Sequence, residues 1–204
     1  MRHALEADHV AAVASLAVRG AGSAGTARLG ALWGLGHAAA IMVVGGAVLL
    51  GGAQLPRSWP LVFESMVGLM LLALGIDALK WRQTDAVGGA PSVPPQRRAL
   101  LVGIVHGMAG SAALVLLMAG TAQSTMLGLL QLALFGVGSI GGMVLLSLAL
   151  SLSLRNAAIR ALALHRTVVG MVGFVTALLG LCLLWKHTLP AHRASLQPVV
   201  SMFG

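Results

Sequence analysis

The sequence predicts an all-α, polytopic membrane protein whose six transmembrane helices form two halves of three, related as an inverted repeat. Three observations support this prediction. Of the 204 residues, 58% are hydrophobic and only 9% are charged, whereas soluble proteins carry about 25% charged residues. Apolar stretches of about 20 residues, the length that spans a bilayer, follow one another along the chain. Short motifs of the first half recur in the second half at a nearly constant distance.

Five stretches are apolar over a spanning length: Leu29–Leu55, Trp59–Leu79, Ala99–Gly120, Met126–Leu154 and Leu164–Trp185. A sixth segment, His3–Val18, precedes them and is shorter and more polar. Because carboxylates that face lipid are costly, we expect this segment to be a helix packed inside the bundle. A cleavable signal peptide is not expected, since Glu6 and Asp8 contradict a basic amino-terminal region.

The whole chain, residues 1–204, is predicted to form one membrane domain. Residues 1–82 make the first three-helix half, and residues 99–187 make the second. Between them, residues 83–98 form a cytoplasmic linker, which is rich in glycine and proline. Residues 188–204 are expected to be a frayed tail.

Lysine and arginine are distributed unevenly between the two ends of the predicted helices. The end that holds the amino terminus carries four of them, Arg2, Arg57, Lys186 and Arg193. The other end carries nine, namely Arg19, Arg28, Lys80, Arg82, Arg97, Arg98, Arg155, Arg160 and Arg166. Because positive loops face the cytoplasm, both termini are predicted to lie outside a bacterial inner membrane. This prediction assumes six spans. If His3–Val18 does not cross, the amino terminus lies in the cytoplasm and the loop assignments stay the same.

The internal repeat rests on three pairs of matching segments, which lie 102 or 103 residues apart: Arg2–Val10 with Val105–Ala113, Trp33–His37 with Phe135–Ser139, and Val67–Leu69 with Val169–Met171. In this alignment His3 matches His106, and Asp8 matches Ser111. Three helices are an odd number, so the second half enters the membrane from the opposite side. Transporters of this architecture bind substrate near the interface of the repeats.

The first segment concentrates the candidate ligands of a metal ion: His3, Glu6, Asp8 and His9. Imidazole and carboxylate groups together suit divalent transition metals. At 100° per residue, Glu6 lies about 60° from both His3 and His9, so these three share one face of a helix. Asp8 falls about 100° beyond His9, where it either orients an imidazole or binds the ion from an unwound turn.

Two further histidines are candidates from other helices. His37 lies near the start of the next helix, where Gly34 and Gly36 allow a neighbouring helix to approach closely. Asp8 and His9 of the first segment are expected to meet His37 at the middle depth of the membrane. His106 is a candidate contributor from the second half. A single membrane histidine also serves as an ordinary hydrogen bond between helices. Four ionisable groups within seven residues would cost several kcal/mol each in lipid unless paired or bound to metal.

The sequence RHALEADHVAA at Arg2–Ala12 resembles the signature helix of the nickel/cobalt transporter (NiCoT) family, and GLGH at Gly34–His37 resembles its second motif. Together with GIVHGMAGSAAL in the second half, these motifs are similar to a short branch related to urease-accessory membrane permeases. The resemblance implies uptake of Ni2+ or Co2+, with His3, Asp8 and His9 essential. Glu6 stands where the family usually has aspartate, and the family's later acidic motif is absent, since Asp85 is the last acidic residue.

The expected function is therefore uptake of a divalent metal ion, Ni2+ first and Co2+ next, by a protein that is not an enzyme. The ion is the transported substrate, and no resident cofactor is expected. Without a GxxxxGK[ST] motif, energy must come from a gradient or a partner. Proteins that mature a nickel enzyme are candidate partners. Nucleic acid is not, because the net charge of +8 fits arginine-rich loops and only 4% of residues are aromatic.

Three alternatives remain open: a non-transporting accessory subunit that hands nickel to an enzyme assembly, a metal exporter of related fold, and an intramembrane metallohydrolase. The last would bind Zn2+ through His3, Asp8 and His9 and use Glu6 as a general base, but the sequence lacks the HExxH spacing. Met1-Arg2-His3 also forms a candidate square-planar chelate for Ni2+ through the terminal amine.

Overall fold

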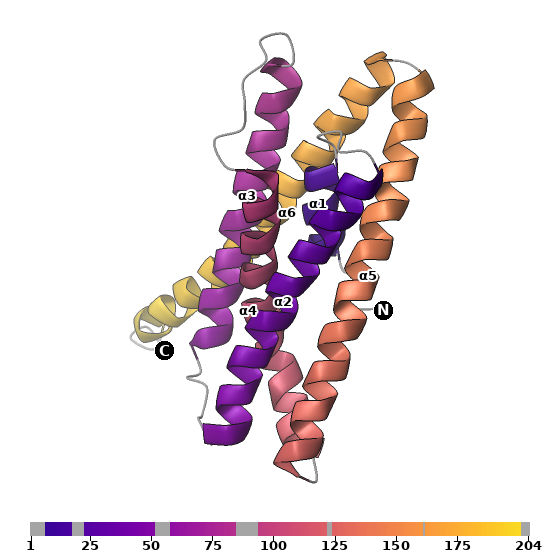
Figure 1. The fold of residues 1–204 in the computed structure, drawn as a ribbon. Helices are drawn as coiled ribbons and strands as arrows, with labels where there is room; N and C mark the ends of the chain where they lie inside the picture. The colour runs from indigo at the N-terminus through magenta and orange to yellow at the C-terminus, as the bar shows by residue number, and fades with distance from the viewer. Residues whose placement is uncertain are drawn as a thin grey trace.

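The chain folds into a bundle of helices, seen in a computed structural model that describes residues 7–17, 23–51, 58–84, 94–121, 124–160 and 162–200. The helices in chain order are α1 (Ala7–Ala17), α2 (Ser23–Gly51), α3 (Trp59–Thr84), α4 (Pro95–Thr121), α5 (Thr125–Arg160) and α6 (Leu162–Val200) (Figure 1). All regular secondary structure within these ranges is helical, as predicted.

Four helices contain a segment long and apolar enough to cross a membrane: Ala24–Gly51, Leu61–Lys80, Thr125–Leu152 and Arg166–Lys186. The sequence predicted six spans. The described part of the first one, α1, has 11 residues, about 16 Å of helix, which is half the thickness of the hydrocarbon core. The described part of α1 is therefore too short to cross the bilayer by itself. With 27 residues, α4 has the length of a span.

The helices extend beyond the predicted apolar stretches. α2 begins at Ser23, six residues before the predicted start, and α5 continues to Arg160. α6 runs to Val200 and so includes most of the predicted tail, while α3 and α4 shorten the predicted linker from both sides. Hydropathy locates the part of a helix that lies in lipid, whereas alanine, leucine, arginine and glutamine also favour helix in the polar region beyond it.

The short helix α1 lies inside the bundle and contacts all five other helices. The main pairings around it are α2 with both α4 and α5, and α3 with α6 (Figure 1). Five consecutive residues of α1 are buried, from Ala11 to Ser15. The small side chains of alanine and serine allow this close packing on every side, and the prediction of an internal first helix is confirmed.

Glycines bring the backbones of α2 and α4 into direct contact. A Cβ atom on Gly103 would overlap the carbonyl oxygen of Trp33, and one on Gly107 would overlap that of His37. Gly36 lies equally close to the Leu100 carbonyl, and Gly34 lies against Ile140 of α5. Only glycine permits such an approach, so the expected role of Gly34 and Gly36 is confirmed. This contact sets the positions of the histidines that α2 and α4 carry.

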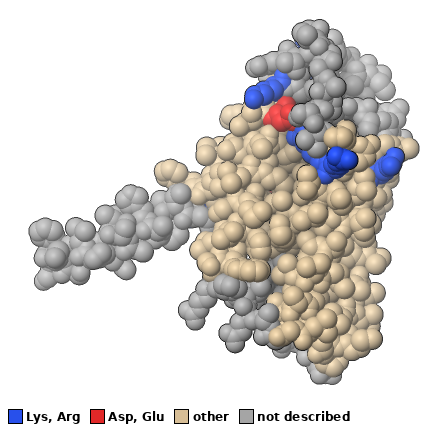
Figure 2. All heavy atoms as spheres, turned by 60° about the vertical axis from the view of Figure 1, so that its left-hand side comes forward, with Lys and Arg blue, Asp and Glu red and all other residues tan. Residues whose placement is uncertain are grey.

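Positive side chains gather where α2, α4 and α6 begin and α3 ends. We call this end of the bundle the basic end, and it carries Arg28, Lys80, Arg97, Arg98 and Arg166. Figure 2 shows lysine and arginine near one end of the face in view, while most of that face is uncharged. Asp77 of α3 forms an ion pair with Arg98 of α4, a partner that the sequence did not indicate. At the opposite end, Glu64 of α3 lies 3.7 Å from Lys186 of α6.

Candidate metal centre

Three helices contribute the polar side chains at the centre of the bundle. Asp8 and His9 lie in the first turn of α1, His37 lies in α2 and His106 lies in α4. The three histidines are buried, with exposed fractions of 1%, 0% and 2% respectively. Imidazoles in this position are shielded from solvent, so neighbouring groups must supply the hydrogen bonds that water would otherwise make.

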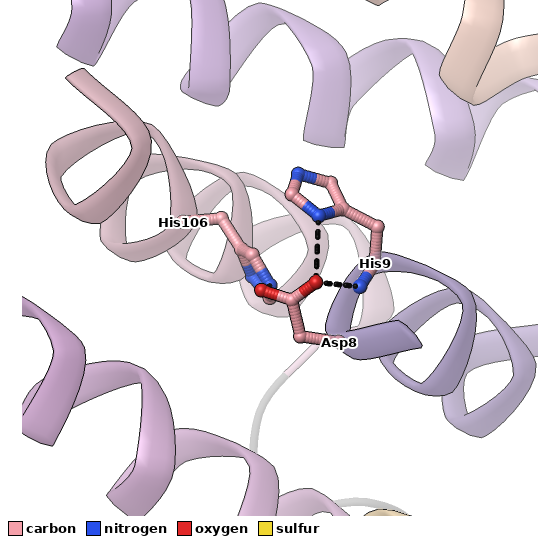
Figure 3. A group of neighbouring side chains, drawn as sticks. All are labelled: Asp8, His9 and His106. Carbon is pink, nitrogen blue, oxygen red and sulfur yellow. Dashed lines mark hydrogen bonds and ion pairs between the residues drawn. The ribbon is translucent and has the colours of Figure 1, made fainter. Parts of the chain in front are cut away.

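The Asp8 carboxylate joins two of these histidines (Figure 3). Its Oδ1 atom accepts a hydrogen bond of 2.9 Å from the backbone N–H of His9 and lies 3.0 Å from Nδ1 of the same residue. Its Oδ2 atom lies 3.5 Å from Nε2 of His106. The side chain of Asp8 is 31% exposed, so the carboxylate marks the one edge of this trio that is not buried.

The ligand atoms of Asp8, His9 and His106 lie within 4.8 Å of one another. Tetrahedral ligands at about 2.1 Å from an ion lie about 3.4 Å from one another. Closing the widest pair by up to about 1.4 Å, shared between its two side chains, therefore brings all three ligands onto one ion. Two nitrogens and one carboxylate oxygen suit a borderline transition metal better than Mg2+ or Ca2+, which prefer oxygen ligands.

His9 is at the middle of a cluster of rings. Its ring centroid lies 4.5 Å from that of His106 and 5.5 Å from that of His37, the second pair meeting edge to face. Trp33 completes the cluster, with its ring 5.6 Å from His9 and 5.8 Å from His106. Trp33 belongs to the WGLGH motif, but the sequence analysis gave it no role, because a buried aromatic residue is most often part of a core.

The structure brings together Asp8, His9 and His37 with His106, the candidate contributor from the second half, all of which the sequence singled out. Asp8 faces both His9 and His106, so it has the geometry of a bridging ligand as well as that of an orienting group. His3 and Glu6, and with them the Met1-Arg2-His3 chelate, lie outside the described residues. That these side chains bind a metal ion stays a prediction.

Hydroxyl groups hold α1 in place behind the candidate site. Thr176 of α6 donates a hydrogen bond of 2.7 Å to the Val172 carbonyl, and its Oγ1 atom lies 3.2 Å from the hydroxyl of Ser15 in α1. Both side chains are buried. This contact fixes the height of α1 against α6 and thereby that of Asp8 and His9. No sequence pattern indicates this contact, since one serine and one threonine in apolar helices form no motif.

Comparison with known proteins finds one clear likeness. The chain is 28% identical over 198 residues to the urease accessory protein UreH of Bacillus sp. (strain TB-90). The alignment covers 89% of this chain and 85% of that protein. No family model matches the chain, and no solved structure matches it. The likeness supports the relation to urease-accessory membrane proteins that the sequence motifs indicated, and it extends over nearly the whole bundle.

Proposed function

We propose that this protein carries Ni2+, and Co2+ as the next choice, across a bacterial inner membrane into the cell, and that Asp8, His9, His37 and His106 bind the ion on its way. The observation that carries the proposal is the placement of ligand atoms from Asp8, His9 and His106 within 4.8 Å of one another in the middle of an apolar bundle. His3 and Glu6 extend this ligand set from the residues that precede α1.

The physical argument concerns the cost of a buried charge. A carboxylate and three imidazoles at membrane depth are expensive unless they pair or bind a cation. A divalent ion that reaches the site loses its hydration shell, and the carboxylate compensates for part of that loss. The mixed nitrogen and oxygen ligands select Ni2+ and Co2+ over the more abundant Mg2+.

The relative's name favours a second reading of the same site. An accessory protein of urease acts in the assembly of another protein, so the chain is a candidate for delivering nickel to such an assembly without moving it across the membrane. A metal exporter would use the same ligands in the opposite direction. The metallohydrolase alternative also requires His3 as a ligand and Glu6 as the general base, and both lie outside the described residues.

Uptake by vesicles that contain only the purified protein separates these readings. A permease should accumulate Ni2+ inside vesicles supplied with an ion gradient, whereas an accessory subunit should bind Ni2+ without accumulating it. Absence of both binding and uptake would refute the proposal. Empty vesicles and vesicles with an unrelated membrane protein of similar size serve as controls.

The inverted repeat is part of the proposal, because it makes the site lie between two related halves. α2 and α5 are antiparallel, and Gly34 lies against Ile140 while Gly136 lies against Ala38. These two contacts exchange with each other under the offset of 102 residues found in the sequence. The reciprocal contact supports a two-fold relation between the helices, with the ion near its axis.

We also propose that the basic end faces the cytoplasm, which places the carboxy terminus outside, because α6 begins at that end and crosses once. Pro94 is exposed next to the start of α4 at that end. A cysteine introduced there (Pro94→Cys), in a Cys182→Ser background, should react with a membrane-impermeant thiol reagent only from the cytoplasmic side. Reaction from outside in intact cells would reverse the orientation.

A further inference from the structure

Each of the three buried histidines has an apolar residue one helical turn away, always in the direction of the basic end. Val13 follows His9 by four residues, and because α2 and α4 run the other way, Trp33 and Val102 precede His37 and His106 by four. We call Val13, Trp33 and Val102 the apolar layer. Their exposed fractions are 2%, 0% and 4%.

The apolar layer is closed by direct packing. All three residues belong to one hydrophobic cluster. The indole of Trp33 contacts the rings of His9 and His106 and packs on Gly103 of α4, where an added Cβ would come within 2.9 Å of its Cδ1 atom. An ion leaving the histidines toward the basic end would first meet the side chains of this layer, which cannot replace its hydration shell.

The opposite side of the histidines is different. Asp8 lies in the first turn of α1, away from the basic end, and its side chain is 31% exposed. The carboxylate therefore offers an approach to the site, while the apolar layer closes the path beyond it. The two features together describe a site open on one side only.

We propose that the apolar layer is the gate between the metal site and the basic end, and that Trp33 is its moving part. The inference rests on the proposed transport function. Val13 and Val102 are β-branched, and such side chains have essentially one rotamer in a helix. Trp33 is the largest of the three, and it packs on a glycine.

The indole N–H of Trp33 supports this assignment. The Nε1 atom is buried and has no hydrogen-bond partner among the residues that the structure describes. Buried tryptophan usually finds such a partner, because an unpaired donor is costly. Because the indole N–H gains no hydrogen bond from the described residues in this position, packing alone holds the indole there.

The test measures access to the site from each end without using metal transport. Ala109 is partly buried and lies three residues beyond His106 on the side away from the basic end. A cysteine there (Ala109→Cys), in a Cys182→Ser background, reports reagent that has passed the gate. Vesicle orientation is determined with the Pro94→Cys variant.

Trp33→Ala should raise the rate at which an impermeant thiol reagent labels this cysteine from the basic end by about 10-fold or more, the effect of a barrier lowered by about 1.4 kcal/mol. Leu132→Ala is the matched control, because Leu132 is also fully buried but lies in α5 outside the cluster. Labelling from the opposite end should be the same in both variants.

Equal labelling of the Trp33→Ala and Leu132→Ala variants from the basic end would overturn the gate. If Trp33→Ala does not fold, Trp33→Phe and Val102→Ala are compared in the same assay, and the gate requires Val102→Ala to be labelled faster than Leu132→Ala. Equilibrium Ni2+ binding is measured on the same samples. If the unsubstituted protein does not bind Ni2+, the proposed function is refuted. If it binds Ni2+ but the rate of cysteine labelling does not change in the gate variants, only the gate is refuted.

Discussion

Ni2+ uptake should fall to the level of empty vesicles when His9 is replaced by alanine. His9 is the residue that touches every other member of the candidate site: its Nδ1 atom lies 3.0 Å from Asp8, and its ring packs on those of His37 and His106. Loss of groups that merely orient a ligand already lowers metal affinity 10–100-fold, so loss of a central ligand should cost about 100-fold or more. Uptake and equilibrium binding of Ni2+ measure both consequences.

Asp8→Ala should have the same effect, since it removes the carboxylate that contacts both His9 and His106. His3→Ala is also expected to abolish Ni2+ uptake, whereas Glu6→Gln should weaken uptake less. His187→Ala is the control, because this residue follows Lys186, at the end of the bundle opposite the basic end. All variants should insert into the membrane normally. Normal uptake by the His9→Ala protein would show that the site lies elsewhere.

The sequence predicted the helices well because the hydropathy of a segment reflects whether lipid or water surrounds it. A helix in lipid must be apolar over about 20 residues, and this requirement is local, so it is visible without knowledge of the fold. The polar first segment was correctly placed inside the bundle by the same reasoning, since Asp8 and His9 would be costly against lipid. The described helix, Ala7–Ala17, lies within the predicted segment His3–Val18.

Much of the candidate site was also visible in the sequence, because its ligands are rare in an apolar chain. Asp8, His9 and His37 stand out as polar exceptions, and the repeat drew attention to His106. Trp33 did not stand out, since an aromatic residue in an apolar helix is ordinary. Its contacts with His9 and His106 depend on the close approach of α2 and α4, which Gly103 and neighbouring glycines allow and which only the three-dimensional structure shows.

Contacts between distant helices were the least predictable. Asp77 forms an ion pair with Arg98 across the linker, although Lys80 and Arg82 lie nearer to it in the sequence. Proximity along the chain favours pairs within one helix, but the packing of α3 against α4 brings the two termini together. The hydrogen bond between Ser15 and Thr176 joins residues 161 positions apart, a separation at which a single sequence carries no pairing signal.

The His106→Ala variant decides whether the second half of the chain takes part in binding the ion. His106 is the only described ligand candidate from that half, and its Nε2 atom lies 3.5 Å from the Asp8 carboxylate. If it binds the ion, its loss should lower Ni2+ affinity by about 10–100-fold and alter the preference between Ni2+ and Co2+. Uptake of both ions by vesicles is the measurement.

An ordinary hydrogen bond between helices predicts a different result for the same variant. Such a bond contributes about 0.6 kcal/mol to the stability of a membrane protein, so His106→Ala would lower the midpoint of thermal unfolding slightly and leave uptake unchanged. His106→Gln separates the two roles, because glutamine keeps a hydrogen-bond donor for Asp8 but is a poor ligand of Ni2+. Restored stability without restored uptake supports binding by His106. A stability loss alone, with affinity and metal preference intact in both variants, would confine the ion to the first half and remove the functional argument for the repeat.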